Sequence, residues 1–201
     1  CILSKVCGFD CLSTKSGSYG QFGYIYIKND VTYKNQVNDS SFTRSLNEAS
    51  TTYAVLYLYY GNILCPSVNL TNNLCYYNVV FETTPTVGTG SPASETCCIS
   101  FSSIVNNTAN HNLLICFQGS TSSQRMDKCN VINNKQNVNS NGIITTTANL
   151  LIKDSCIIGN DERYKAFYAY SSVKITISNC TFDDDIFTNG RYYGTVTVIK
   201  T

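Results

Sequence analysis

The sequence predicts an all-β chain that folds as a right-handed parallel β-helix solenoid of about six to seven irregular coils. Three observations lead to this fold: a repeat of roughly two dozen residues, a composition rich in Asn, Ser, Thr and Tyr, and little charge. Of the 201 residues, 43% are hydrophobic and only 13% are charged, so the chain can bury a core with few solvated side chains. We expect one domain spanning 1–201, because this length suits one continuous core, or at most two small domains.

The repeat is clearest in the C-terminal half of the chain. The segments that begin at Cys129, Cys156 and Cys180 each read Cys, any residue, apolar, any residue, then Asn or Asp, at spacings of 27 and 24 residues. An apolar strand precedes each motif, as at 142–145 and 167–170. Short strands separated by Asn, Gly and Ser, recurring at this period, are typical of a β-helix.

The same frame continues into the N-terminal half with longer spacings. It fits 103–107, then 68–72 and 31–35. The longer spacings predict inserted loops near 38–50 and 75–96, and the second contains a Thr-, Gly- and Pro-rich stretch typical of a loop.

Alternation along a strand predicts which side chains face inward. Cys180 and Phe182 should point into the core, whereas Asn179 and Thr181 should point outward. The Asn or Asp that ends each motif tolerates a left-handed backbone at a corner. Asn side chains aligned in successive coils can also hydrogen-bond along the stack.

On turns such as 150–158 and 173–182, the sequence resembles the pectate-lyase-like right-handed β-helix superfamily. It is most similar to Asn- and Cys-rich β-helix surface proteins of microbes and protists. The resemblance covers residues 100–201 well and 1–100 loosely. It implies the fold more strongly than any activity, but the superfamily includes polysaccharide lyases and hydrolases.

Candidate catalytic residues of that kind are the carboxylates Asp183, Asp184 and Asp185, which could act as general acid and base. Enzymes of the polygalacturonase type also carry Gly-His-Gly and Arg-x-Lys segments. Here the single histidine, His111, lies between two asparagines, and Arg191 is followed by Tyr. We therefore favour a solvated turn and a non-enzymatic protein, with a lyase or hydrolase acting on acidic polysaccharide as the alternative.

Lyases of this fold hold calcium with clustered Asp. Asp154, Asp161 and Glu162, with Arg163 and Lys165 nearby, are the residues to consider for such a site. Their spacing is not specific, and no Cys-x-x-Cys zinc pattern is present. We expect no metal and no cofactor.

Eleven cysteines and four Asn-x-Ser/Thr sequons favour a secreted or cell-surface protein. The sequons predict glycosylation at Asn38, Asn69, Asn106 and Asn179. Cys129, Cys156 and Cys180 share one repeat position and should form a column of buried free thiols. The remaining cysteines are candidates for disulfides that staple loops: Cys1, Cys7, Cys11, Cys65, Cys75, Cys97, Cys98 and Cys116.

The net charge of +1 argues against nucleic acid as a partner, and no apolar run is long enough to span a membrane. Because the chain opens with Cys1, we expect a processed or truncated form, and 194–201 reads as a strand with no polar cap after it. We therefore expect a structural or adhesion protein that associates end to end into a filament or longer solenoid. Glycans or a host or cell-surface protein are possible partners.

Outward tyrosines give a second alternative function. Tyr24 and Tyr26, and Tyr168 and Tyr170, are two residues apart, and 53–60 contains four more tyrosines. Rings aligned on an outer face would form a stacking platform for sugars, as in a carbohydrate-binding module.

Overall fold

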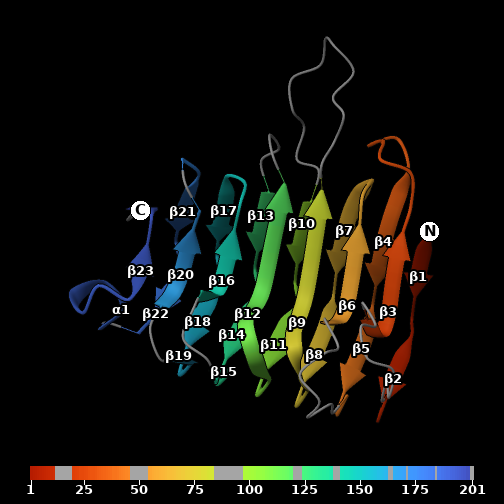
Figure 1. Cartoon of the computed structure of the whole chain (residues 1–201), viewed down its shortest axis with the longest axis horizontal. Coiled ribbons are helices and arrows are strands. Elements are labelled where there is room, and N and C mark those ends of the chain that lie inside the picture. Colours follow the sequence, from red (N-terminus) through yellow and green to blue (C-terminus); the bar gives the residue numbers. More distant parts are fainter. Residues whose placement is uncertain are drawn as a thin grey trace.

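The computed structural model describes residues 1–11, 20–45, 54–83, 97–119, 124–137, 141–162, 165–170, 172–183 and 185–199. In these ranges the chain is all-β apart from one short helix, and every strand pairing is parallel (Figure 1). The strands form three sheets, here named A, B and C.

Sheet A has eight strands in the order β1 (Ile2–Ser4), β4 (Lys34–Asn38), β7 (Asn62–Pro66), β10 (Cys97–Ser100), β13 (Gln124–Asp127), β17 (Leu150–Lys153), β21 (Lys174–Ser178) and β24 (Thr195–Ile199). Sheet B has seven: β2 (Cys7–Phe9), β5 (Ser40–Thr43), β8 (Val68–Thr71), β11 (Ser103–Val105), β14 (Asn130–Ile132), β18 (Cys156–Ile158) and β22 (Thr181–Phe182). Sheet C runs through β3 (Gly20–Tyr26), β6 (Ala54–Tyr59), β9 (Leu74–Thr83), β12 (Thr108–Gly119), β16 (Gly142–Thr146), β20 (Lys165–Ala169) and β23 (Tyr192–Tyr193), and β15 (Lys135–Gln136) and β19 (Asp161–Glu162) extend it.

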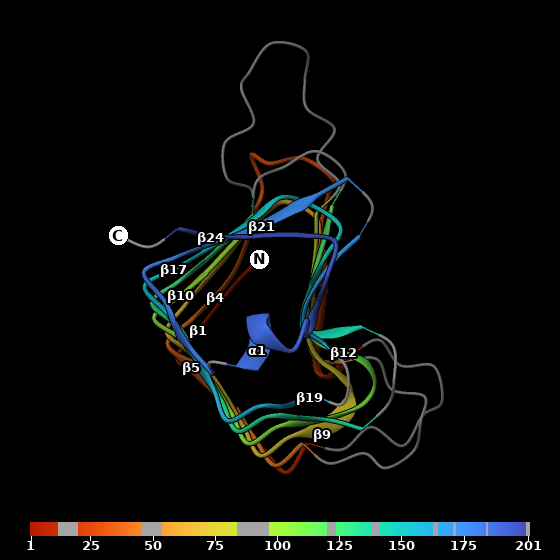
Figure 2. The same ribbon diagram turned by 90° about the vertical axis from the view of Figure 1, so that its left-hand side faces the viewer.

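The chain visits the sheets in a fixed order, A then B then C, and we call each passage a round. Each strand pairs with the equivalent strands one round before and one round after it. Viewed along the stack, the sheets form the sides of a roughly triangular outline around a common interior (Figure 2). The expected all-β, all-parallel architecture is thus confirmed.

Inward side chains form columns that run along the stack. In sheet B the strand register aligns Phe42, Leu70, Ile104, Val131 and Ile157, all at most 1% exposed. In sheet C, Phe81 and Phe117 stack with ring centroids 5.2 Å apart. One apolar cluster extends through all rounds, so each round buries its inner face against its neighbours, and no round could do so alone.

Two corners repeat a left-handed residue, the first corner in all seven rounds and the second in the first six. Between sheets A and B it is Lys5, Asp39, Ser67, Phe101, Lys128, Asp154 or Asn179, with φ from 47° to 57°. Between sheets B and C it is Asp10, Arg44, Asn72, Asn106, Asn133 or Gly159. The prediction that motif-ending Asn residues adopt this conformation is confirmed at Asn72 and Asn133.

A column of buried asparagines follows the second corner. Asn73, Asn107, Asn134 and Asn160 are each at most 9% exposed. The side-chain oxygen of Asn107 accepts hydrogen bonds from the backbone N–H and from Nδ2 of Asn73, both at 2.9 Å. Asn134 and Asn160 repeat both bonds in the next rounds. The expected hydrogen bonding of Asn side chains along the stack is therefore confirmed.

The frame predicted for the first rounds is wrong. The register aligns Ser40 with Val68 and Cys7 with Ser41. The residues equivalent to Val68 in the first two rounds are therefore Val6 and Ser40. Residues 31–35 instead lead into β4. The start of each predicted insertion is also strand: β4 and β5 occupy most of 34–43, and β9 reaches Thr83. Residues 46–50 of the first segment and 84–96 of the second lie outside the described residues.

A short helix, α1 (Asp185–Thr188), covers the C-terminal end of the core. Figure 2 shows α1 within the triangular outline. Ile186 is 1% exposed, and the Phe187 ring lies 5.1 Å from Phe182 and 6.3 Å from Phe167. The strand expected at 194–201 is present as β24, at the edge of sheet A. End-to-end association through such strand edges stays a prediction.

Candidate binding surface

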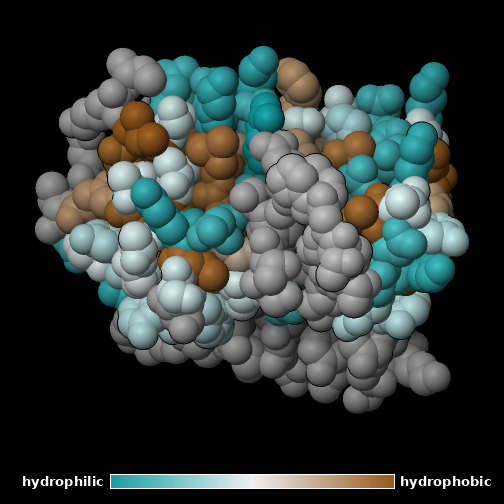
Figure 3. All heavy atoms as spheres, turned by 90° about the horizontal axis from the view of Figure 1, so that it is seen from above, coloured by the Kyte–Doolittle hydropathy of each residue, from teal (hydrophilic) through white to brown (hydrophobic). Residues whose placement is uncertain are grey.

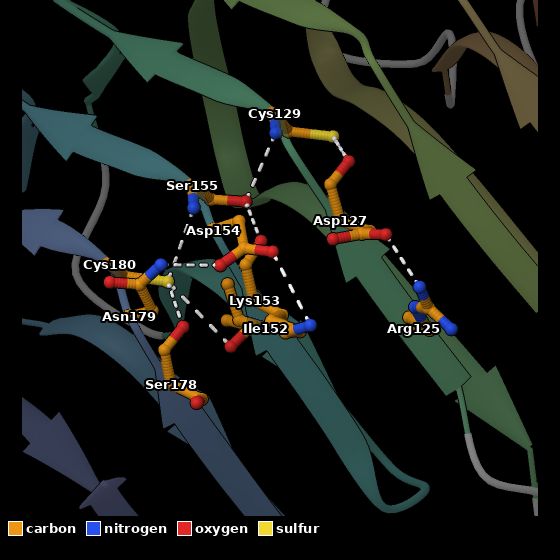
Figure 4. A network of polar contacts seen from close by, with 10 residues as sticks. All are labelled: Arg125, Asp127, Cys129, Ile152, Lys153, Asp154, Ser155, Ser178, Asn179 and Cys180. Carbon is orange, nitrogen blue, oxygen red and sulfur yellow. Dashed lines mark hydrogen bonds and ion pairs between the residues drawn. The ribbon is translucent and has the colours of Figure 1, made fainter. Parts of the chain in front are cut away.

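The predicted cysteine column is a mixed Ser and Cys column at the corner between sheets A and B. The register pairs Asn130 with Cys156 and Cys156 with Thr181, so Cys156 faces outward and Ser155 takes the inward position. The prediction for Cys156 is thus wrong by one residue. Figure 4 shows Cys129, Ser155 and Cys180 in successive rounds.

Each member of this column satisfies the backbone of the tight corner. Ser155 Oγ accepts the N–H of Cys129 at 3.1 Å and donates to the Lys153 carbonyl at 2.7 Å. The Cys180 thiol likewise accepts the N–H of Ser155 at 3.4 Å and donates to the Ser178 carbonyl at 3.2 Å. Serine and cysteine are therefore interchangeable here, because each supplies one donor and one acceptor.

Five of the cysteines considered for disulfide staples have free thiols in the structure: Cys1, Cys7, Cys11, Cys65 and Cys97. The thiols of Cys129, Cys156 and Cys180 are free, as expected. Burial raises the pKa of the Cys129 thiol to about 12 and also raises the pKa of Cys65 and Cys97. These three thiols behave as small hydrophobic groups. The side chain of Cys75 lies outside the described residues.

The acidic residues considered for catalysis have structural partners. Asp183 accepts the N–H of Gly159 at 2.8 Å, and Asp185 opens α1 and pairs with Arg191 at 3.2 Å. Asp184 lies outside the described residues. These contacts give each carboxylate a structural role, and a lyase or hydrolase remains a prediction.

Asp154 and Asp161, the two described carboxylates considered for calcium, do not come together. Asp154 lies at the corner between sheets A and B, where it pairs with Lys153 and accepts a hydrogen bond from Asn179 at 2.6 Å. That bond holds the pKa of the Asp154 carboxyl below its usual value. Asp161 belongs to β19 on the other side of sheet B and lies 4.0 Å from Lys135. Arg163 lies outside the described residues.

A shallow hollow of about 360 Å³ opens where sheet C gives way to sheet A. Its lining includes Asn149, Leu151, Lys174 and Thr176, so among the lining residues only lysine carries charge. The face seen from above mixes hydrophobic and hydrophilic side chains (Figure 3). This hollow offers no acid and base pair.

Tyrosines gather on the outer face of sheet C at its N-terminal end. This N-terminal tyrosine cluster consists of Tyr24, Tyr26, Tyr57, Tyr59 and Tyr60. The register places Tyr24 beside Tyr57 and Tyr26 beside Tyr59. The rings of Tyr26 and Tyr59 stack at 5.1 Å with an angle of 12° between their planes. Tyr57 is buried, whereas Tyr26 is 60% exposed.

A second group, the C-terminal tyrosine cluster, contains Tyr168, Tyr170 and Tyr193. Tyr168 and Tyr193 stack at 4.5 Å with an angle of 18°, and the Tyr170 ring lies 4.7 Å from Tyr168. Tyr193 is 52% exposed. Tyr193 could not be assigned to this cluster from the sequence, because only the register of β23 against β20 brings it beside Tyr168.

Both clusters lie on one line along the stack. The register connects Tyr24, Tyr57, Val80, Cys116, Thr145, Tyr168 and Tyr193. Tyr57 and Tyr168 are four strands apart, or about 19 Å at the usual strand spacing. Cys116 and Thr145 between them are buried, so the clusters form two separate surfaces. The predicted alignment of outward Tyr rings is confirmed for both pairs named from the sequence.

The three comparisons with known proteins give no relatives: no family model, no curated protein and no solved structure matches the chain. Within the described residues, no helix has the length and apolar character needed to cross a bilayer.

Proposed function

We propose that the chain is a right-handed parallel β-helix of seven rounds, one for each strand of sheet B. The fixed visiting order of the sheets and the exclusively parallel pairing between rounds support this topology. Right-handed connections between parallel strands are strongly favoured, because a right-twisted strand packs back onto its sheet in that sense.

On this scaffold we propose a non-enzymatic function, adhesion at a cell surface or outside the cell through carbohydrate held by the tyrosine clusters. The observation that carries the proposal is the stacking of Tyr26 on Tyr59 and of Tyr168 on Tyr193 on the outer face of sheet C. Exposed aromatic rings on a rigid sheet present apolar area at low entropic cost. The four sequons support an extracellular location.

The chemistry of the clusters favours a sugar over a charged ligand. Each cluster presents ring faces together with phenolic hydroxyls, and none of its members is charged. A pyranose offers the matching combination, an apolar C–H face and a rim of hydroxyls. Tyr combines both functions in one side chain, since its ring is apolar and its hydroxyl donates and accepts hydrogen bonds.

A glycan array with the purified protein tests this proposal. We expect binding to a defined set of oligosaccharides and a loss of at least tenfold in affinity for Tyr26→Ala or Tyr193→Ala. Tyr33→Ala is the matched control, because Tyr33 is 47% exposed but belongs to neither cluster and lies against Lys28. Absence of binding to every glycan, or equal losses in all three variants, would refute the proposal.

A further inference from the structure

Three of the four sequons surround sheet B. Asn69 is exposed on the outer face of β8, between Ser41 and Ser103 in the neighbouring strands. Asn106 and Asn179 are exposed at the two corners that border the sheet. Asn38 differs, because it is half-buried at the end of β4 in sheet A. No sequon asparagine lies in a strand of sheet C.

We infer that Asn69, Asn106 and Asn179 carry N-linked glycans and that Asn38 does not, which makes sheet B the glycan-covered face. The modification transfers an oligosaccharide from a lipid-linked diphosphate donor to the Asn Nδ2. A C–N bond forms, the anomeric C–O bond to the diphosphate breaks, and the amide loses one proton. The inference is independent of what sheet C binds.

The surroundings of the three sites accommodate a glycan. The neighbours of Asn69 in its column are serines, which leave space above the sheet. Asn179 Nδ2 donates to Asp154 Oδ1 at 2.6 Å. Glycosylation replaces only one of the two Nδ2 hydrogens, so the other keeps this bond. Both corner asparagines project from a turn, where bulky surface modification is tolerated.

Asn38 lacks this freedom. Its side-chain oxygen is buried and has no hydrogen-bond partner. Its sequon serine, Ser40, is 2% exposed. The Ser40 hydroxyl donates to the Asn38 carbonyl at 2.7 Å and accepts the N–H of Val6. A glycan on Nδ2 would have to pass through this packed corner.

An apolar strip gives the glycans a physical role. Val105, Ile132 and Ile158 align on the outer face of sheet B and are half-buried. Asn106 follows Val105 directly, so its glycan would lie beside the strip. Contiguous exposed apolar side chains promote association, and a bulky hydrophilic glycan would oppose it.

Secretion from a glycosylating eukaryotic host, followed by glycopeptide mass spectrometry, tests the inference. We expect glycans at Asn69, Asn106 and Asn179 and an unmodified Asn38. Thr71→Val, Thr108→Val and Thr181→Ala should each remove one glycan while keeping the asparagine and its backbone conformation. Ser40→Ala should leave the glycan count unchanged. A glycan at Asn38, or an unmodified asparagine at any of the other three sites, would overturn the assignment.

Sedimentation of the same material tests the role of the glycans. We expect the glycosylated protein to be monomeric at micromolar concentration and the enzymatically deglycosylated protein to associate. An additional Ile132→Thr substitution should suppress that association. Deglycosylated protein that stays monomeric would overturn the shielding of sheet B. The assignment of the glycosylation sites is tested separately, by the glycopeptide masses.

Discussion

The corners of the stack and the outer face of sheet C follow opposite rules. At the corners, the same backbone conformation recurs in round after round, and in the buried column beside one corner the same hydrogen bonds are made by Asn each time. Along sheet C, one outward column changes from Tyr to Cys to Thr and back to Tyr. The comparison teaches that the repeat constrains the interior and the corners, whereas the outer face is free to carry binding residues.

Asn107→Ala should have the largest effect of the corner substitutions on the free energy of unfolding. Asn107 accepts from the backbone and side chain of Asn73 and donates to the Leu70 carbonyl at 2.8 Å. Its loss leaves several buried polar groups without partners, so we expect a loss of about 3–5 kcal/mol in the free energy of unfolding. Urea denaturation measures this. Asn130→Ala, at an exposed outward position, should change stability by less than about 0.5 kcal/mol.

Buried thiols predict that the corner region weakens at alkaline pH. Because the pKa of Cys129 is raised to about 12 in the folded protein, the folded state keeps a proton that the unfolded state loses near its ordinary value of 9.0. Stability is therefore complete below pH 9 and falls as pH rises toward 12, by up to about 1.4 kcal/mol per pH unit. Unfolding curves from pH 8 to 11 should show a shallower decline for Cys129→Ser.

Cys129 and Cys156 allow the stability cost of substituting an inward cysteine to be compared with that of an outward one. Cys129→Val removes an acceptor and a donor to the Asp127 carbonyl at 3.3 Å, so we expect a cost of about 1–2 kcal/mol. Cys129→Ser retains both functions and should cost less. Cys156→Ser should have almost no effect, because Cys156 faces outward. A cost for Cys156→Ser as large as that of Cys129→Val would contradict the register.

The smallest effect belongs to the face that we assign to binding. Tyr193→Ala removes one ring of a stacked pair, which is worth about 0.5–1.5 kcal/mol. Thermal unfolding should therefore shift by only a few degrees, although binding is lost. A larger destabilisation would mean that the cluster supports the fold rather than a ligand.

Much of the fold could be predicted because period and composition reflect the stacking directly. Which alternate side chains of each strand face inward could not be predicted. Ile157 and Ile158 are both apolar, and Ser155 and Cys156 are both small, so the alternation of small and apolar residues also fits one residue off. A shift of one residue exchanges the two faces of a strand. The strand register resolved this ambiguity, just as it revealed Tyr193.

The corner asparagines show the same limit. The motif ends at Asn72 and Asn133 are left-handed, whereas those at Asn107 and Asn160 belong to the buried column. Pairs of neighbouring asparagines, such as Asn72 with Asn73 and Asn133 with Asn134, fill both positions. The sequence therefore predicts both roles but does not assign them.

The account depends most directly on the register of the stacked rounds, and alkylation of the native protein tests it. Iodoacetamide treatment followed by peptide mass spectrometry should modify Cys156 in the folded protein, together with exposed Cys1 and Cys7. Cys65, Cys97 and Cys129 should react only after unfolding, since they are buried. If Cys156 is protected as strongly as Cys129, the cysteines form one buried column, and the faces assigned here are wrong.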